Sequence, residues 1–184
     1  MTNEADGVLE RNGERSVVRF RRTLAQGPDA VWAALTEDEH LAAWFPTTIE
    51  GSRCAGAPLR FAFREGEGEP FDGQMTAFEP PSLMELRWAG DLLRFELEAE
   101  GSGCVLTLTV TFADHGKAAR DGTGWHVCLE QLVACGAGTP PPWSPQERWR
   151  QVYPSYAVAF GPEASSVGPP PGMGNGRDGA PSAV

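Results

Sequence analysis

The side chains with the greatest capacity for chemistry lie in residues 124–133. At about 100° per residue, one helical arc collects most of the apolar residues of this stretch and its continuation. These are Trp125, Cys128, Leu129, Leu132, Val133, Cys135 and Gly136. His126 lies at the border of the arc, where an imidazole could exchange a proton or orient a ligand. Because such a histidine is more often a boundary residue with satisfied hydrogen bonds, we predict no catalytic residue and keep His126 as the one candidate.

The cysteines and histidines do not have the spacing of a metal site. Cys54, Cys104, Cys128 and Cys135 include no CxxC pair, and the three histidines are scattered. Cys128 and Cys135 lie about 10 Å apart along the expected helix, which is too far for a disulfide. The chain also lacks a phosphate-binding loop and a nucleophile paired with a base. We therefore expect reduced thiols, no metal and no cofactor.

Ten residues are candidates for lining a ligand cavity. They are Trp44, Phe45, Phe61, Phe63, Met75, Trp88, Phe95, Trp125, Cys128 and Leu129. Each could instead belong to a plain hydrophobic core, since aromatic side chains usually just pack. As a set they favour a cavity, because ligand sites are mostly apolar with a few polar groups.

Two short helices and a strand precede the stretches that hold most of these residues. Residues 17–24 alternate as a strand does, and Pro28 suits the first position of a helix. Thr36 and Glu39 have the spacing of a capping box, which would begin a second short helix carrying Trp44 and Phe45.

Five later stretches alternate between apolar and polar residues: 59–64, 71–77, 84–88, 93–99 and 106–112. This alternation, with short connections, predicts an antiparallel sheet with one dry and one wet face. Arginines of the wet face should pair with glutamates there: Arg60, Arg64, Arg87 and Arg94 with Glu85, Glu96 and Glu98. Residues 114–123 are interpreted as a polar link into the long helix.

The chain of 184 residues is expected to hold one folded domain at 16–138. Residues 1–15 are interpreted as a disordered arm and residues 161–184 as a disordered tail, since neither offers enough apolar surface to offset ordering. Between them, residues 139–160 should form an extension with a short helix packed on the domain, because Ser144 and Glu147 make a capping box.

The net charge of −10 makes nucleic acid an improbable partner. The first residues resemble no secretory signal, and no apolar run is long enough for membrane insertion. A cytoplasmic location is therefore expected. The oligomeric state is left open.

Three motifs together resemble the START-like (SRPBCC) superfamily. The first is Pro28-x-x-Val31-Trp32-x-x-Leu35-Thr36 followed by Leu41-x-x-Trp44-Phe45. The second is Gly73, then Pro80-Pro81 and Leu86-x-Trp88, and the third is Gly124-Trp125-x-x-x-Leu129-x-x-Leu132. Residues 16–138 are most similar to the branch of homologues of the activator of the heat-shock-protein-90 ATPase.

This resemblance implies an α+β helix-grip fold. A curved seven-stranded antiparallel sheet would surround a long C-terminal helix, with two short helices after the first strand and a cavity between sheet and helix. The resemblance also implies that small-molecule binding is the expected role, since bacterial members of this branch are mostly small-molecule binders of unknown ligand.

Three functions follow as alternatives. The first is the binding of a small hydrophobic or amphipathic molecule in that cavity. The second is an enzyme similar to the polyketide cyclases and aromatases, with His126 as the acid or base. The third is a chaperone-associated stress-response role in which residues 143–160 contact a protein partner through an exposed apolar patch.

Overall fold

The computed structural model describes residues 6–64 and 68–171. The strands within these residues are β1 (Val8–Asn12), β2 (Arg15–Leu24), β3 (Thr47–Glu50), β4 (Pro58–Phe63), β5 (Phe71–Glu79), β6 (Leu83–Trp88), β7 (Asp91–Glu100) and β8 (Gly103–Phe112). The helices are α1 (Pro28–Thr36), α2 (Asp38–Leu41), α3 (Ala118–Gly136) and α4 (Pro145–Phe160), with 3-10 helices η1 (His115–Lys117) and η2 (Glu163–Ser165).

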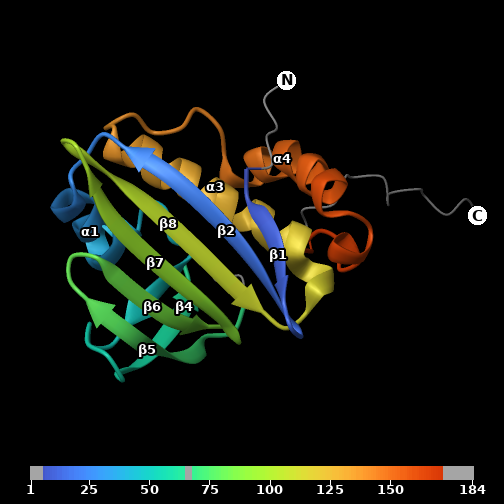
Figure 1. Ribbon diagram of the computed structural model, residues 1–184, viewed down its shortest axis with the longest axis horizontal. Coiled ribbons are helices and arrows are strands. Elements are labelled where there is room, and N and C mark those ends of the chain that lie inside the picture. The colour runs from blue at the N-terminus through green and yellow to red at the C-terminus, as the bar shows by residue number, and fades with distance from the viewer. Residues whose placement is uncertain (1–5, 65–67, 172–184) are drawn as a thin grey trace, which may run out of the picture.

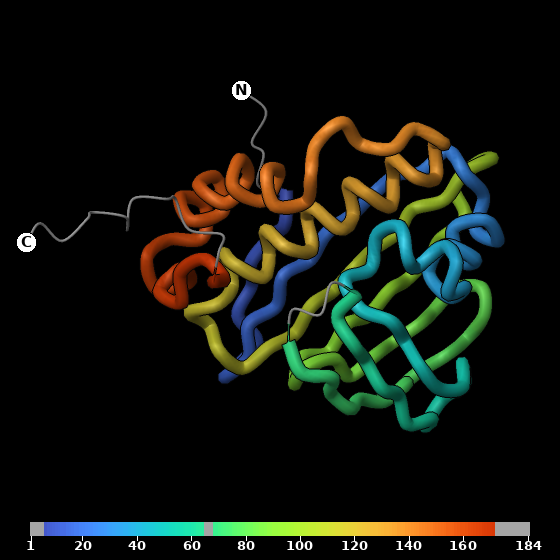
Figure 2. Tube along the Cα trace, turned by 180° about the vertical axis from the view of Figure 1, so that it is seen from behind, coloured from blue at the N-terminus to red at the C-terminus, as the bar shows by residue number. Residues whose placement is uncertain are grey.

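All strands join one antiparallel sheet in the order β1-β2-β8-β7-β6-β5-β4-β3. The sheet is curved, and α3 runs along its inner face (Figure 1). From behind, α4 lies against α3, while α1 and α2 lie over the other end of the sheet (Figure 2). The fold class predicted from the sequence is therefore confirmed, with eight strands in place of seven.

The additional strand, β1, corrects the interpretation of residues 1–15 as a disordered arm. Val8–Asn12 pairs antiparallel with Arg15–Arg19 of β2, and Gly13 takes a left-handed φ of 62° in the turn between them. Because Asn12 pairs with Arg15, the two central residues of the turn are Gly13 and Glu14, and glycine is favoured at the first of these positions in a tight hairpin. Residues 1–5 lie outside the described residues.

The inner face of the sheet is apolar and the outer face is charged. Phe20, Phe95 and Leu108 are fully buried on the inner face. On the outer face Arg94 pairs with Glu85 at 3.2 Å and with Glu96 at 3.1 Å. A register shift between Met75 and Ala77 places Phe78, not Ala77, opposite Met84. Bulges of this kind bend a strand and so contribute to the curvature of the sheet.

The capping box expected at Thr36 and Glu39 is wrong. The Thr36 hydroxyl donates a hydrogen bond back to the Trp32 carbonyl at 2.8 Å, and Glu37 is the N-cap of α2 without a side-chain cap. A threonine near the end of a helix can bond to the carbonyl of the preceding turn, and that bond competes with capping of the next helix. α2 consequently has four residues, and Trp44 and Phe45 follow it in a turn.

The long helix begins at Ala118, so the expected polar link at 114–123 is also wrong. The first turns of α3 bury small residues, including Ala118, Ala119 and Thr123. A Cβ atom at Gly122 would lie 3.2 Å from the Phe160 ring. These small side chains let α4 approach α3 closely, but they give little apolar periodicity for sequence analysis to detect.

The C-terminal part packs on the same core. The predicted capping box is present: the Ser144 hydroxyl accepts from the Glu147 amide at 3.2 Å, and the Glu147 carboxylate accepts from the Ser144 amide at 3.1 Å. α4 is longer than expected, at 16 residues, and it buries Trp149, Val152 and Tyr156. Residues 161–171, expected as the start of a disordered tail, include η2 with its fully buried Ala164. Residues 172–184 lie outside the described residues.

Candidate functional site

Eight aromatic side chains from six parts of the chain meet between the sheet and α3. Phe45 lies 5.7 Å from Trp125 and Trp88 lies 5.4 Å from Trp125, measured between ring centroids. We call the connected set the aromatic cluster. It consists of Trp44, Phe45, Phe61, Phe63, Phe71, Trp88, Phe95 and Trp125.

Seven of these eight rings were predicted as cavity-lining residues. Phe71 was missed, although it pairs in register with Phe61 across β4 and β5, and their rings stack at 5.3 Å. Its place in an alternating stretch could have identified it. The remaining predicted residues, Met75 and Leu129, are fully buried in the same core, and Cys128 is half-buried.

Two indole N–H groups of the cluster, those of Trp44 and Trp88, have hydrogen-bond acceptors. Trp44 donates to the Ala34 carbonyl at 2.9 Å, and Trp88 donates to the buried Thr47 hydroxyl at 3.3 Å. Buried indoles usually find such acceptors, which fix the orientation of the ring. The cluster is therefore held by polar bonds at its periphery as well as by ring packing.

A pocket of about 300 Å³ opens between the turn after α2, the middle of α3 and the beginning of α4. We call it the helix-junction pocket. Four predicted residues line it, namely Trp44, Phe45, Phe63 and Cys128. Its volume is at the lower end of the range for small-molecule sites.

The lining of this pocket is mainly apolar, with Arg64, Gln131 and Gln146 as polar members. Arg64 donates from Nε to the Phe45 carbonyl at 3.2 Å. Burial raises the pKa of the Cys128 thiol to about 12, so this group stays protonated and is a poor nucleophile near neutral pH. The pocket is suited to holding an apolar molecule rather than to acid–base chemistry.

His126 is buried, but it faces the N-terminal segment and α4 instead of the aromatic cluster. Its Nδ1 lies 3.1 Å from the Asp6 carboxylate and 3.1 Å from the Tyr156 hydroxyl. Its Nε2 lies 3.2 Å from the Glu130 carboxylate, but the alignment is too poor for a hydrogen bond. The histidine identified from the sequence thus belongs to a second, polar site.

Six residues form this second site, which we call the buried charge cluster: Asp6, Arg22, His126, Glu130, Arg148 and Tyr156. Arg148 binds the two carboxylate oxygens of Glu130 at 2.7 and 2.8 Å. Arg22 does the same for Asp6, at 2.9 and 3.2 Å. Such two-point pairing is the strongest geometry between arginine and a carboxylate.

Burial and neighbouring charge act in opposition on the pKa values of this cluster. Burial alone would raise the pKa of Glu130, but Arg148 and His126 outweigh it and lower the pKa to about 2. Burial would lower the pKa of His126, but Asp6 and Glu130 outweigh it and raise the pKa above its ordinary value. The imidazole is therefore more readily protonated than in solution.

Sequence reasoning missed Asp6 and Arg22 as site residues. Arg22 shares the inner-face parity of Val18, Phe20 and Leu24 along β2, so it is a charged residue on the apolar side of a strand. This break in the alternation could have identified Arg22 as a candidate site residue from the sequence. Nothing in the sequence links Asp6 to a histidine 120 positions later.

Within the described ranges, no three His, Cys, Asp or Glu side chains gather as they would to hold a metal ion. Among the same residues, no helix combines the length and apolarity needed to cross a membrane.

Solved structures with the same fold include a conserved protein of unknown function, EF2215, from Enterococcus faecalis. It is 16% identical, with a TM-score of 0.72, over 86% of this chain and 92% of that one. CalU16 from Micromonospora echinospora is 23% identical, with a TM-score of 0.67, over 84% of this chain and 96% of that one. The product of gene BPP1335 from Bordetella parapertussis is 26% identical, with a TM-score of 0.63, over 80% of this chain and 86% of that one. No curated protein matches the chain significantly.

The sequence model of one family, described as Activator of Hsp90 ATPase homolog 1-like protein, matches residues 26–137. The matched segment runs from the end of β2 to the end of α3, so it includes the aromatic cluster and most of the helix-junction pocket. Four members of the buried charge cluster lie outside it, namely Asp6, Arg22, Arg148 and Tyr156. The motifs around Trp44, Trp88 and Trp125, the helix-grip architecture and this match agree that the chain belongs to the family of Activator of Hsp90 ATPase homolog 1-like proteins.

Proposed function

We propose that the protein binds a small hydrophobic or amphipathic molecule between the sheet and α3, in the helix-junction pocket. The observation that carries this proposal is that the pocket opens onto Trp44, Phe45 and Phe63, which belong to the aromatic cluster. An apolar ligand gains affinity from burial against such rings, while a few polar groups fix its orientation. Gln131 and Gln146 are in position for that second role.

Binding is better supported than a cyclase-like or aromatase-like reaction. The residues that line the pocket include no carboxylate and no histidine, and the Cys128 thiol among them stays protonated near neutral pH. His126 has all its close polar contacts in the buried charge cluster.

A chaperone-associated role through residues 143–160 has less support. Trp149 and Tyr156 are buried, and Tyr153 and Phe160 are partly buried. The aromatic side chains of this segment therefore offer little exposed surface to a partner.

The test is a titration with N-phenyl-1-naphthylamine, an uncharged fluorescent probe of apolar sites. Wild-type protein is expected to bind one equivalent. Cys128→Phe places a ring in the helix-junction pocket and should weaken binding at least about tenfold, the effect of losing some 1.4 kcal/mol of binding free energy.

Cys54→Phe is the matched control, because Cys54 is exposed on the loop between β3 and β4. That variant should bind the probe as the wild type does. Equal binding by wild type and a folded Cys128→Phe variant would rule out the helix-junction pocket as the binding site.

A further inference from the structure

The Asp6 carboxylate is held by three side chains that come from three different elements. Arg22 of β2 contacts both of its oxygens, at 2.9 and 3.2 Å. His126 of α3 lies 3.1 Å from Oδ1, and the Tyr156 hydroxyl of α4 donates to Oδ1 at 3.3 Å. The Tyr156 oxygen also accepts from the Gly7 amide at 3.0 Å, which aligns the N-terminal segment.

The receptor for this carboxylate is buried, whereas the carboxylate itself is not. The side chains of Arg22 and His126 are 14% and 5% exposed, and Tyr156 is fully buried, while Asp6 is 44% exposed. Arg22 therefore stands on the inner face of β2 as a charge that needs a partner. Asp6 of the N-terminal segment is that partner.

The charges around the site favour an anion at this position. Among the described residues, the carboxylate that pairs with Arg22 is that of Asp6, and when Asp6 is set aside the readily protonated His126 keeps Glu130 as its carboxylate neighbour. Arg148 already pairs with Glu130 through both oxygens. The position of the Asp6 carboxylate is thus electropositive. If no anion occupied it, the positive charge of Arg22 and His126 would remain uncompensated at a largely buried site.

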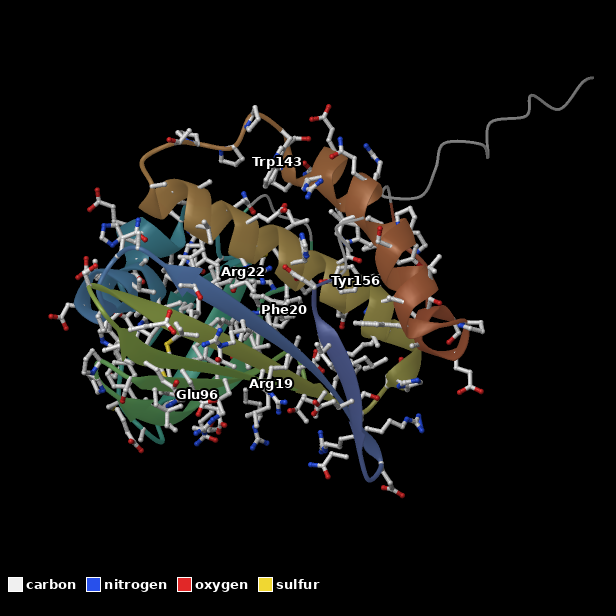
Figure 3. All side chains as sticks on the ribbon, turned by 45° about the horizontal axis from the view of Figure 1, so that its top comes forward. Arg19, Phe20, Arg22, Glu96, Trp143 and Tyr156 are labelled. Carbon is white, nitrogen blue, oxygen red and sulfur yellow. The ribbon has the colours of Figure 1, made fainter. Side chains whose placement is uncertain are left out.

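A groove of about 510 Å³ begins at this point. Its charged lining residues are Asp6, Arg22 and Glu130, and its apolar lining includes Val133, Pro141 and Trp143. Figure 3 shows Trp143 on the loop that passes above α3, on the same side of the molecule as Arg22 and Tyr156. A ligand whose charged group took the place of Asp6 would therefore have room for an apolar body.

We propose that Arg22, His126 and Tyr156 form a binding site for an amphipathic carboxylic acid, whose apolar chain lies in the groove beneath Trp143 and whose carboxylate displaces Asp6. Asp6 is then an intramolecular competitor that closes the site when no ligand is present. The site is separate from the helix-junction pocket, because it uses Glu130, Val133 and Ala134 of α3 whereas that pocket uses Gly124, Cys128 and Gln131.

The test is calorimetric titration of the full chain with sodium decanoate, with n-decanol as the uncharged probe of equal length. Asp6→Ala removes the competitor and should tighten decanoate binding about tenfold or more, if Asp6 occupies its site at least nine-tenths of the time. Binding of decanol should not change. Arg22→Gln added to Asp6→Ala should abolish the gain.

Glu10→Ala is the matched control. Glu10 of β1 pairs with Arg19 on the outer face of β2 at 3.2 Å, so this variant also removes a carboxylate from an arginine of the same strand. It should bind decanoate as the wild type does. Cys128→Phe, which fills the helix-junction pocket, should leave the gain from Asp6→Ala intact.

If Asp6→Ala does not fold, Asp6→Asn gives the same comparison, because it keeps the shape of the side chain and removes its charge. Unchanged or weaker decanoate binding in the folded variant would overturn the proposal and show that Asp6 only fastens the N-terminal segment. An equal gain for decanol, or a gain that survives Arg22→Gln, would also overturn it.

Discussion

Replacing Trp125 with alanine is expected to lower the free energy of unfolding by about 3–5 kcal/mol, the usual cost of truncating a large buried aromatic residue. Trp125 is 5% exposed, and it joins the α3 side of the aromatic cluster to the sheet side through its contacts with Phe45 and Trp88. Its removal leaves a cavity and also breaks both ring contacts. Urea unfolding followed by circular dichroism measures the loss.

Trp143→Ala provides the comparison for this prediction. Trp143 is only half-buried, on the loop before α4, so its truncation should cost about 1 kcal/mol or less. Similar losses in the two variants would mean that the aromatic cluster does not bind the sheet to α3 as described.

Replacing Glu130 with glutamine is expected to cost about 2–3 kcal/mol near pH 6, because it takes the carboxylate away from both Arg148 and His126. The pKa of Glu130 is lowered from 4.5 to about 2. A lowered pKa means that the charged form stabilises the folded state above about pH 4.5, and that this contribution is lost as the pH falls toward 2. The difference between wild type and variant should therefore shrink over that interval.

The same variant should also change how the free energy of unfolding depends on pH in the neutral range. The pKa of His126 is raised, so its protonation stabilises the wild type fully below pH 6.5, and this contribution is lost as the pH rises through the raised pKa. Without Glu130, less stability should be lost over this rise in pH. Urea unfolding at a series of pH values measures both effects.

Glu96→Gln is the control for Glu130→Gln. Glu96 pairs with Arg94 at 3.1 Å on the outer face of the sheet and is 40% exposed, so it should contribute less than about 1 kcal/mol. An equal loss in both variants, or a difference from wild type that stays constant into acid, would contradict the described role of Glu130.

The sequence was sufficient for the parts of the fold that depend on periodicity. Alternating apolar residues located β4 to β8, and the Ser144–Glu147 capping box located the start of α4. The motifs around Trp44, Trp88 and Trp125 brought together residues that the structure joins in one cluster.

What the sequence missed depends on contacts between distant segments. The start of α3 was hidden because Ala118 and Gly122 pack against other elements without being strongly apolar. β1 carries a single partly buried core residue, Leu9, and acquires order by pairing with β2. The buried charge cluster needs Asp6, Arg22, His126 and Tyr156 to meet, and only the complete fold specifies that meeting.

The most direct test of ligand binding at the helix-junction pocket is the set of indole N–H resonances from the six tryptophans during titration with N-phenyl-1-naphthylamine. Trp44 and Trp149 line the pocket, whereas Trp143 lines the separate groove. The resonances of Trp44 and Trp149 are expected to shift with saturation at one equivalent, and that of Trp143 is expected to stay in place. A titration that moves Trp143 alone, or none of the six resonances, would contradict binding between the sheet and α3.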